Sequence, residues 1–253
     1  MQWRLLMRDI NNYQERYNVP NFEDYQIMYR RKKILEIMQS VKHDSILEIG
    51  IGMCPIFNYL DDFDKYYFFE PGKEFFDNAI KIAGNDSRIK GINKPFEFDE
   101  NIKEQGLDFV VCASLLHELE NPKLLVQDIF NISNENTRVL INVPNANSFH
   151  RVLAMNMGLI KEVKEFSDRN YYFQQHSVFD MNDIVQLVGE CGFDVEDKGY
   201  LFIKPFTHSQ MFEMMKNNII DENVLDGLYK MTDMYPELGS EIWVLCKKKL
   251  YLN

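Results

Sequence analysis

Apolar positions along the chain fall into two patterns: short continuous runs and longer stretches with helical spacing. Residues 25–41 (YQIMYRRKKILEIMQSV) place Ile27, Ile34 and Met38 at helical intervals, which predicts an amphipathic helix. The run at 45–50 (SILEIG) is short, apolar and closed by a glycine, which predicts a buried strand.

The same alternation continues to the end of the chain. Further strands are predicted at 65–70, 87–93, 106–114, 137–144, 193–202 and 240–249. Helices are predicted at 72–83, 121–133 and 180–192, with a short helix from Pro55 to about Leu60. Strands that alternate with helices predict a doubly wound α/β sheet, and apolar central strands indicate that helices cover both faces.

Two segments interrupt this alternation. Residues 145–179 and 204–238 are rich in aromatic residues and methionine, and each follows the carboxyl end of a predicted strand. Ligands bind at that edge of open α/β sheets, so we expect both insertions to cap a site. Residues 1–44 are expected to form an N-terminal helical cap segment, and residues 45–253 the main domain.

Composition and charge narrow the class of protein. The chain has 253 residues, of which 45% are apolar, and a formal net charge of -11. An acidic chain repels phosphate backbones, so nucleic acid is not the expected partner. No long apolar stretch predicts a signal peptide or a membrane span. The four cysteines form no paired motif, which favours reduced thiols in the cytoplasm and no metal site.

The first chemically informative motif is the loop at 45–55 (SILEIGIGMCP). Gly50 and Gly52 allow a tight turn that brings backbone close to a ligand. Pro55 stands where a dinucleotide-binding loop has its third glycine, and it has no N–H to offer a pyrophosphate. Glu48 would repel a pyrophosphate and attract an ammonium group.

A second acid completes the ligand pattern. Glu70 ends the second predicted strand, 20 residues beyond Gly50, where a carboxylate can bind the ribose diol of a nucleoside. An adenosine without phosphates and with a cationic amino-acid tail is S-adenosylmethionine (SAM).

The motifs together resemble those of class I SAM-dependent methyltransferases. ILEIGIG (46–52), YFFEP (67–71), DFVVCASLLHELENP (108–122) and RVLINVPN (138–145) occur in that family's order. The resemblance implies a seven-stranded, mostly parallel sheet, SAM as cofactor and S-adenosylhomocysteine (SAH) as product. It also implies cofactor-binding residues: Arg30 or Arg31 for the SAM carboxylate, then Glu48, Gly50, Gly52, Glu70, Pro71, Pro95, Phe96, Ala113, Ser114 and His117.

His117 follows the fourth predicted strand. Its stretch, SLLHELENP (114–122), is similar to a VLEHVxDP motif of small-molecule methyltransferases, with the histidine and the acid in reversed order. A histidine there could act as the general base for a hydroxyl acceptor, or it could pack on SAM. The sequence leaves both roles open.

A polar stretch, VPNANSFHRV (143–152), follows the fifth predicted strand. His150 is a second catalytic candidate, and with Arg151 it could bind an anionic group. Asn145 and Ser148 are candidate substrate ligands, or they cap the following helix. The pattern PNxxSxHR followed by MGLI is similar to methyltransferases of bacterial surface-polysaccharide gene clusters.

Two further substrate-binding candidates lie in YYFQQHSVFD (171–180). His176 resembles an element that closes the cleft in relatives, and Tyr172 either stacks on substrate or seals the core. Tyr171 and Phe173 are expected in the core, and His43 and His208 are interpreted as surface residues.

The sequence therefore predicts an O-methyltransferase. Its acceptor would be a small anionic or nucleotide-linked metabolite of bacterial capsular polysaccharide biosynthesis, methylated on a sugar hydroxyl or on a phosphoramidate or phosphoryl oxygen. The alternatives are an RNA-modifying methyltransferase and a non-catalytic SAM-binding protein. Whether the chain forms a homodimer stays open.

Overall fold

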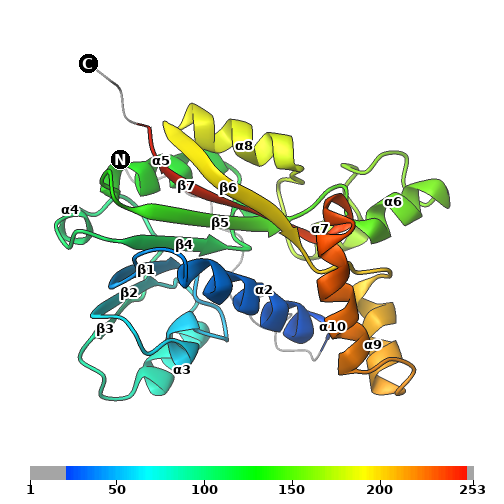
Figure 1. Cartoon of the computed structure of the whole chain (residues 1–253), viewed down its shortest axis with the longest axis horizontal. Helices are drawn as coiled ribbons and strands as arrows, with labels where there is room; N and C mark the ends of the chain where they lie inside the picture. Colours follow the sequence, from blue (N-terminus) through cyan, green and yellow to red (C-terminus); the bar gives the residue numbers. More distant parts are fainter. Residues whose placement is uncertain (1–20, 250–253) are drawn as a thin grey trace.

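The described residues, 21–249 of this computed structural model, contain seven strands that form a sheet in the order β3-β2-β1-β4-β5-β7-β6 (Figure 1). β7 runs antiparallel to both of its neighbours, and the remaining pairs are parallel. The strands are β1 (Ser45–Ile49), β2 (Lys65–Phe69), β3 (Ile89–Ile92), β4 (Phe109–Ala113), β5 (Arg138–Pro144), β6 (Phe193–Leu201) and β7 (Glu241–Lys248). The predicted doubly wound, mostly parallel α/β sheet is confirmed.

Helices fill the connections between the strands. They are α2 (Glu23–Met38), α3 (Lys73–Ala83), α4 (Glu100–Lys103), α5 (Pro122–Ile132), α6 (Phe149–Asn156), α7 (Asp168–Tyr172), α8 (Met181–Glu190), α9 (His208–Lys216) and α10 (Glu222–Lys230). Short 3-10 turns add η1 (Ile56–Tyr59), η2 (Leu116–Glu118), η3 (Met231–Asp233) and η4 (Pro236–Leu238). The first 20 residues of the predicted N-terminal cap lie outside the described residues.

The α-helix predicted after the glycine loop was wrong, because the structure has a short 3-10 turn there. Pro55 has ψ of 136°, which is extended rather than helical, and η1 after it is a single 3-10 turn. A proline at this place fixes φ but does not itself start a helix, and here the 3-10 turn ends at Tyr59, six residues before β2 begins.

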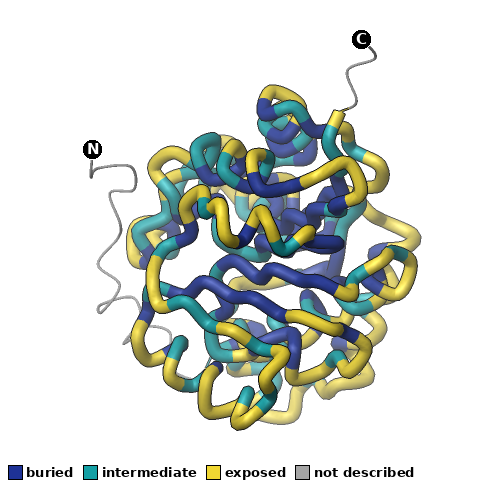
Figure 2. The backbone as a smooth tube through the Cα atoms, turned by 90° about the vertical axis from the view of Figure 1, so that its left-hand side faces the viewer, coloured by how far each residue is buried: buried dark blue, intermediate teal, exposed yellow. Residues whose placement is uncertain are grey.

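Two apolar layers hold helices against the sheet. Neighbouring strand residues point to opposite faces, so Leu47 lies in the layer with α5 and α8, while Ile46 lies in the layer with α2 and α3. Figure 2 shows the strands as a buried centre within more exposed helices and loops. Within residues 21–249, no helix has both the length and the apolar character that a membrane span requires.

The two insertions carry four helices. α6 and α7 lie between β5 and α8, and α9 and α10 lie between β6 and β7. In Figure 1 these four helices gather beyond the carboxyl ends of β4 and β5. The N-terminal helix α2 packs on the sheet and extends toward the same end.

Candidate active site

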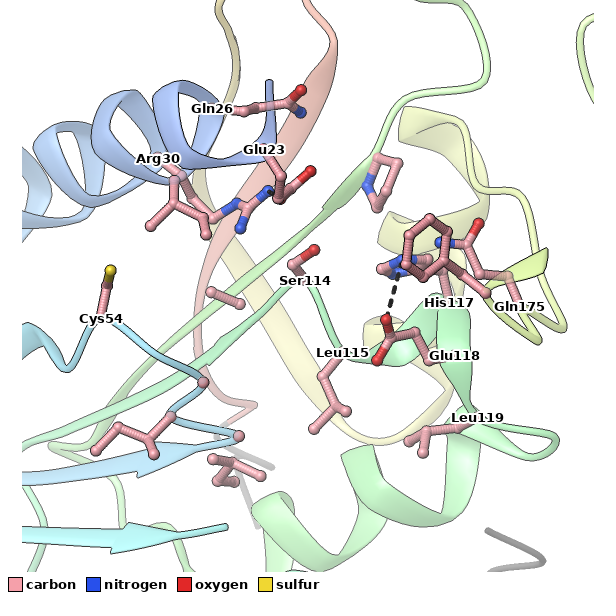
Figure 3. A pocket seen from close by; sticks show the side chains of 18 of the residues that line it. Glu23, Gln26, Arg30, Cys54, Ser114, Leu115, His117, Glu118, Leu119 and Gln175 are labelled. Atoms are coloured by element: carbon pink, nitrogen blue, oxygen red, sulfur yellow. Dashed lines mark hydrogen bonds and ion pairs between the residues drawn. The ribbon is translucent and has the colours of Figure 1, made fainter. Parts of the chain in front are cut away.

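The loops at the carboxyl ends of the parallel strands enclose a cavity of about 300 Å³ (Figure 3). Its lining comes from α2, from the loops after β1, β2, β4, β5 and β6, and from the cap helices. In Figure 3, Glu23, Gln26 and Arg30 of α2 lie on one side, and His117 and Glu118 lie on the other.

The glycine loop adopts a left-handed backbone conformation that residues other than glycine rarely adopt. Gly50 has φ of +79° and Gly52 has φ of +56°. A Cβ on Gly50 would lie 3.3 Å from the Leu115 side chain, and Gly50 N–H donates to the Phe69 carbonyl at 2.9 Å. The turn therefore needs glycine at position 50 and joins the ends of β1 and β2.

Glu70 is oriented by this loop. Its Oε2 accepts a hydrogen bond from Gly52 N–H at 3.2 Å, and its Oε1 accepts one from Gly72 N–H at 2.7 Å. The side chain is buried and lines the cavity. A carboxylate held in this way at the end of β2 could bind a ribose diol.

Glu48 lines the same part of the cavity and is also buried. Its Oε2 accepts the Tyr66 hydroxyl at 2.6 Å and the Ile56 N–H at 3.3 Å. Burial raises the pKa of the Glu48 carboxyl to about 8, against the opposing effect of these hydrogen bonds. The first N–H after Pro55 thus binds a carboxyl of the protein itself, which is incompatible with a pyrophosphate at that point.

An apolar wall lies beside Glu70. Phe96 is buried and packs edge-to-face on Phe69, with ring centroids 5.0 Å apart, and Pro95 lines the cavity next to it. An apolar wall, two carboxyls and a glycine turn fit a phosphate-free adenosine with a cationic tail. When bound, SAM supplies an electrophilic methyl group on a sulfonium.

The end of β4 is backbone-strained. Ser114 has φ of +55°, which is uncommon for a residue other than glycine, and its N–H donates to the Asn142 carbonyl at 2.8 Å. Ala113 and Ser114 line the cavity, and His117 follows on η2. His117 Nε2 lies 3.9 Å from Glu118 Oε1, and both side chains are buried.

The two candidate arginines on α2 have different surroundings, although both line the cavity. Arg30 donates to both oxygens of Glu241, at 2.7 and 2.6 Å, and to Glu23 Oε1 at 2.9 Å. Arg31 stacks its guanidinium over the Tyr59 ring at 3.6 Å. Most of the hydrogen-bonding capacity of Arg30 is therefore used within the protein.

Only some of the residues predicted to bind substrate line the cavity. Asn145, His150 and Arg151 line the cavity, and Ser148 and His176 do not. Ser148 is fully buried. His176 meets this region through its backbone N–H, which donates to the His117 carbonyl at 2.9 Å.

Arg151 and the tyrosines differ from their predicted surroundings. Arg151 donates to the backbone carbonyls of Val163 and Glu165, so it shapes the loop after α6. Tyr171 and Tyr172 are 68% and 50% exposed, and neither lines the cavity. The core position expected for Tyr171 was wrong, and Tyr172 neither seals the core nor faces the cavity, because both side chains of α7 point to the surface.

The sequence analysis missed a polar cluster, which we call the Lys204 cluster: Glu23, Gln26, Arg169, Lys204 and His208. Lys204 and Gln26 are buried, and the Arg169 side chain is 40% exposed. Lys204 Nζ lies 2.8 Å from His208 Nδ1, and His208 Nε2 lies 3.0 Å from Glu23 Oε2. Arg169 lies 3.7 Å from the same Glu23 oxygen. All five residues line the cavity.

The surface interpretation of His208 and His43 was wrong. The His208 side chain is 12% exposed, because Thr207 caps α9 and places His208 at its first position, against α2. His43 is 11% exposed and binds the Val41 carbonyl at 2.8 Å. Thr207 and Gln210 have the spacing of a capping box, which marks the start of a helix in the sequence. No local pattern showed that α2 would cover His208.

Burial and charge shift the pKa values in this cluster. Burial, with the positive charge of Arg169, lowers the pKa of Lys204 to about 7. Burial, with the charge of Lys204, lowers the pKa of His208 to about 3. Burial raises the pKa of Glu23, but Arg30 and the His208 hydrogen bond outweigh it and hold that pKa well below its usual range.

The strand order, the glycine turn after β1 and the carboxyl at the end of β2 together define a class I methyltransferase. Residues 22–198 match the family model described as a methyltransferase domain, and the chain belongs to this family. It is a SAM-dependent methyltransferase. No curated protein matches the sequence.

Solved structures share the fold at low sequence identity. A SAM-dependent methyltransferase from Aquifex aeolicus is 12% identical, with a TM-score of 0.56, over 94% of this chain and 98% of that one. A structure of the complex between the Haloferax volcanii Trm112 methyltransferase activator and a methyltransferase is 11% identical, with a TM-score of 0.57, over 92% of this chain and 94% of that one. The plantazolicin methyltransferase BamL, solved in complex with a triazolic desmethylPZN analog and SAH, is 16% identical, with a TM-score of 0.53, over 95% of this chain and 97% of that one.

Proposed function

We propose that this protein transfers the methyl group of SAM to an oxygen of a small anionic or nucleotide-linked metabolite in the cytoplasm. The acceptor atom would be a sugar hydroxyl or a phosphoramidate or phosphoryl oxygen. The observation that carries the proposal is a cavity whose cap side is rich in cations in a chain of net charge -11.

The two sides of the cavity have opposite charge. Glu70, at the end of β2, places a carboxylate where it suits the cationic cofactor, and the Glu48 carboxyl of β1, which burial keeps mostly protonated near pH 7, lines the cavity beside it. On the cap side, Arg151 and Arg169 line the cavity together with Lys204, which is partly an ammonium near pH 7. The acidic side chains nearest to them in the lining are Glu23 of α2 and Glu118 of η2. Positive potential in a partly desolvated cleft favours an anionic ligand.

The cofactor-side roles follow from the contacts already described. Glu70, with Pro71 beside it, would bind the ribose, and Pro95 and Phe96 would flank the adenine. Gly50 and Gly52 would let the backbone approach the methionine tail. Arg31 suits the SAM carboxylate better than Arg30, because stacking on Tyr59 uses the face of its guanidinium and not its N–H groups.

The residues proposed to face the acceptor follow β4 and β5. Ala113, Ser114 and His117 would border the transferred methyl group from the end of β4. His150 is a weak candidate for an acid, because burial holds its pKa well below the usual value and keeps the ring neutral. Of the predicted ligands, Asn145 and Arg151 reach the cavity.

A role in bacterial surface-polysaccharide biosynthesis is part of the proposal. It is supported by the similarity of VPNANSFHRV (143–152) to methyltransferases of such gene clusters. It is also supported by the cation-rich cap side, since nucleotide-linked sugars carry a diphosphate.

The decisive experiment incubates the protein with deuterium-labelled SAM and a panel of nucleotide-linked sugars and phosphoramidates. We expect one acceptor to gain a labelled methyl group by mass spectrometry. Structured RNA is the comparison substrate: its methylation in place of the panel would support the RNA-modifying alternative. SAM binding without methylation of any compound would support a non-catalytic SAM-binding protein.

A charge variant checks the acceptor side. Arg169→Gln should raise the KM of the anionic acceptor at least about tenfold and leave the SAM dissociation constant within about twofold. Arg88→Gln is the matched control, because Arg88 is exposed and pairs with Asp86 away from the cavity. Equal effects of the two variants would contradict an anionic acceptor held by the cap.

A further inference from the structure

Lys204 has unusual partners for a buried lysine. It lies three residues beyond β6, is 3% exposed and lines the cavity. Its Nζ contacts an imidazole, His208 Nδ1 at 2.8 Å, and an amide, Gln26 Oε1 at 3.5 Å. Buried lysines usually pair with carboxylates, and here the neighbouring carboxylates bind other groups.

Those other bonds fix the orientation of both partners. Glu241 accepts from Arg30 and from Gln26 Nε2, so the amide oxygen of Gln26 is turned to Lys204. Glu23 is ionised and can only accept, so the His208 proton lies on Nε2 and the Nδ1 lone pair is left for Lys204.

The amino group of Lys204 therefore donates two hydrogens whatever its charge. One goes to His208 Nδ1 and one to the Gln26 oxygen. The remaining tetrahedral position holds a third proton in the ammonium and a lone pair in the amine. Lys204 lines the cavity, so this position is the one that would meet a ligand.

Charged groups from several elements act on this equilibrium. Glu23 of α2 and Glu241 of β7 favour the ammonium, and Arg30 of α2 and Arg169 of α7 favour the amine. His150 of α6 and His208 of α9 are neutral near pH 7. Burial is the largest effect, and with a pKa of about 7 a substantial share of Lys204 is amine at neutral pH.

We propose that Lys204 is the general base that removes the proton from a hydroxyl acceptor, with His208 and Glu23 as positioning residues. This rests on the proposed methyl transfer and narrows the acceptor to a hydroxyl within an anionic molecule. The hydroxyl proton goes to the Lys204 lone pair, and the oxygen's electron pair forms the new C–O bond. The C–S bond of the donor breaks with its pair on sulfur, and the Lys204 ammonium returns its proton to water.

The first test needs no acceptor. The full chain, labelled with ¹³Cε-lysine and saturated with SAH, is titrated by NMR, and the Lys204 signal is the one missing in Lys204→Arg. We expect a midpoint near pH 7. Glu23→Gln should lower the midpoint by removing a negative charge, and Arg169→Gln should raise it by removing a positive one. A midpoint above about 9 overturns the proposal.

The second test uses methyl transfer to the compound that the nucleotide-sugar panel identifies. Log kcat/KM should rise with slope 1 up to about pH 7 and then level off. Lys204→Arg and Lys204→Met should both lose at least about 100-fold in kcat with SAH affinity retained. Lys198→Arg, on the exposed part of β6, is the matched control.

The variants show whether Lys204 acts as a general base or only binds the anionic part of the acceptor. Activity near wild type in Lys204→Arg would overturn the proposal, since arginine keeps the positive charge but cannot accept a proton. Recovery of Lys204→Ala by added ethylamine would support it. Loss of activity in His117→Ala with retention in Lys204→Met would assign the base to His117. No product from the wild-type protein would refute the proposed function, and the NMR midpoint would still decide the state of Lys204.

Discussion

At the scale of single residues, the carboxyls around the cavity differ in what binds them. Glu70 accepts two backbone N–H groups, and Glu241 accepts a guanidinium. Glu48 has a hydroxyl and one N–H as partners and is buried, so its protonated form is favoured up to about pH 8. Residue type does not show this difference, because it comes from the partner atoms.

The raised pKa of Glu48 predicts a pH dependence of stability. The unfolded carboxyl ionises near pH 4.5, and the folded one resists ionisation until about pH 8. Stability therefore falls as pH rises through this window, by about 1 kcal/mol or more, and Glu48→Gln should lack that loss. Urea unfolding of both proteins at pH 5 and pH 8.5, without SAM, measures the difference.

The exposed residue Glu120 provides the control for this comparison. Glu120→Gln should follow the wild-type pH dependence. Parallel stability curves for Glu48→Gln and the wild-type protein would show that Glu48 ionises normally in the folded state.

At the scale of elements, the β1–η1 loop joins two strand ends and positions Glu70. Its geometry depends on two left-handed residues and on a hydrogen bond from Gly50 to β2. The sequence motif predicted this turn, since only local backbone freedom is involved. The helix expected after Pro55 was wrong: Pro55 is extended, with ψ of 136°, and a single 3-10 turn follows it.

We expect Gly50→Val to weaken SAM binding at least about tenfold. The variant must leave φ of +79° or meet Leu115, at a cost of about 1–3 kcal/mol. Gly106→Val is the matched control, because Gly106 also has positive φ, at +67°, but does not line the cavity. Both should lose stability in urea, and calorimetry should show weaker SAM binding for Gly50→Val alone.

At the scale of the whole molecule, α2 and β7 join the two ends of the described chain. Arg30 lies 211 residues from Glu241, and their bidentate ion pair is almost fully buried. The contact fixes α2 over the cavity, where Glu23 and Gln26 of the same helix reach the Lys204 cluster. Removing one partner of such a pair leaves an uncompensated buried charge.

Arg30→Met should therefore destabilise the fold by about 3–5 kcal/mol. The double variant Arg30→Met/Glu241→Leu should recover much of this loss, since neither charge is then buried without its partner. Lys73→Met, in an exposed pair with Asp77, should cost at most about 1 kcal/mol. A loss below about 1 kcal/mol for Arg30→Met in urea unfolding would show that the pair does not hold α2.

The sequence by itself determined the alternation of strands and helices, the glycine turn and the place of Glu70, because each depends on residues close together in the chain. The tertiary structure decided the Lys204 cluster. Its hydrogen bonds join residues 178 and 185 positions apart, and their protonation depends on burial that no local pattern encodes. The turns after β1 and β2 follow from short motifs, and the Lys204 cluster exists only after α2, α7, α9 and the segment after β6 have packed together.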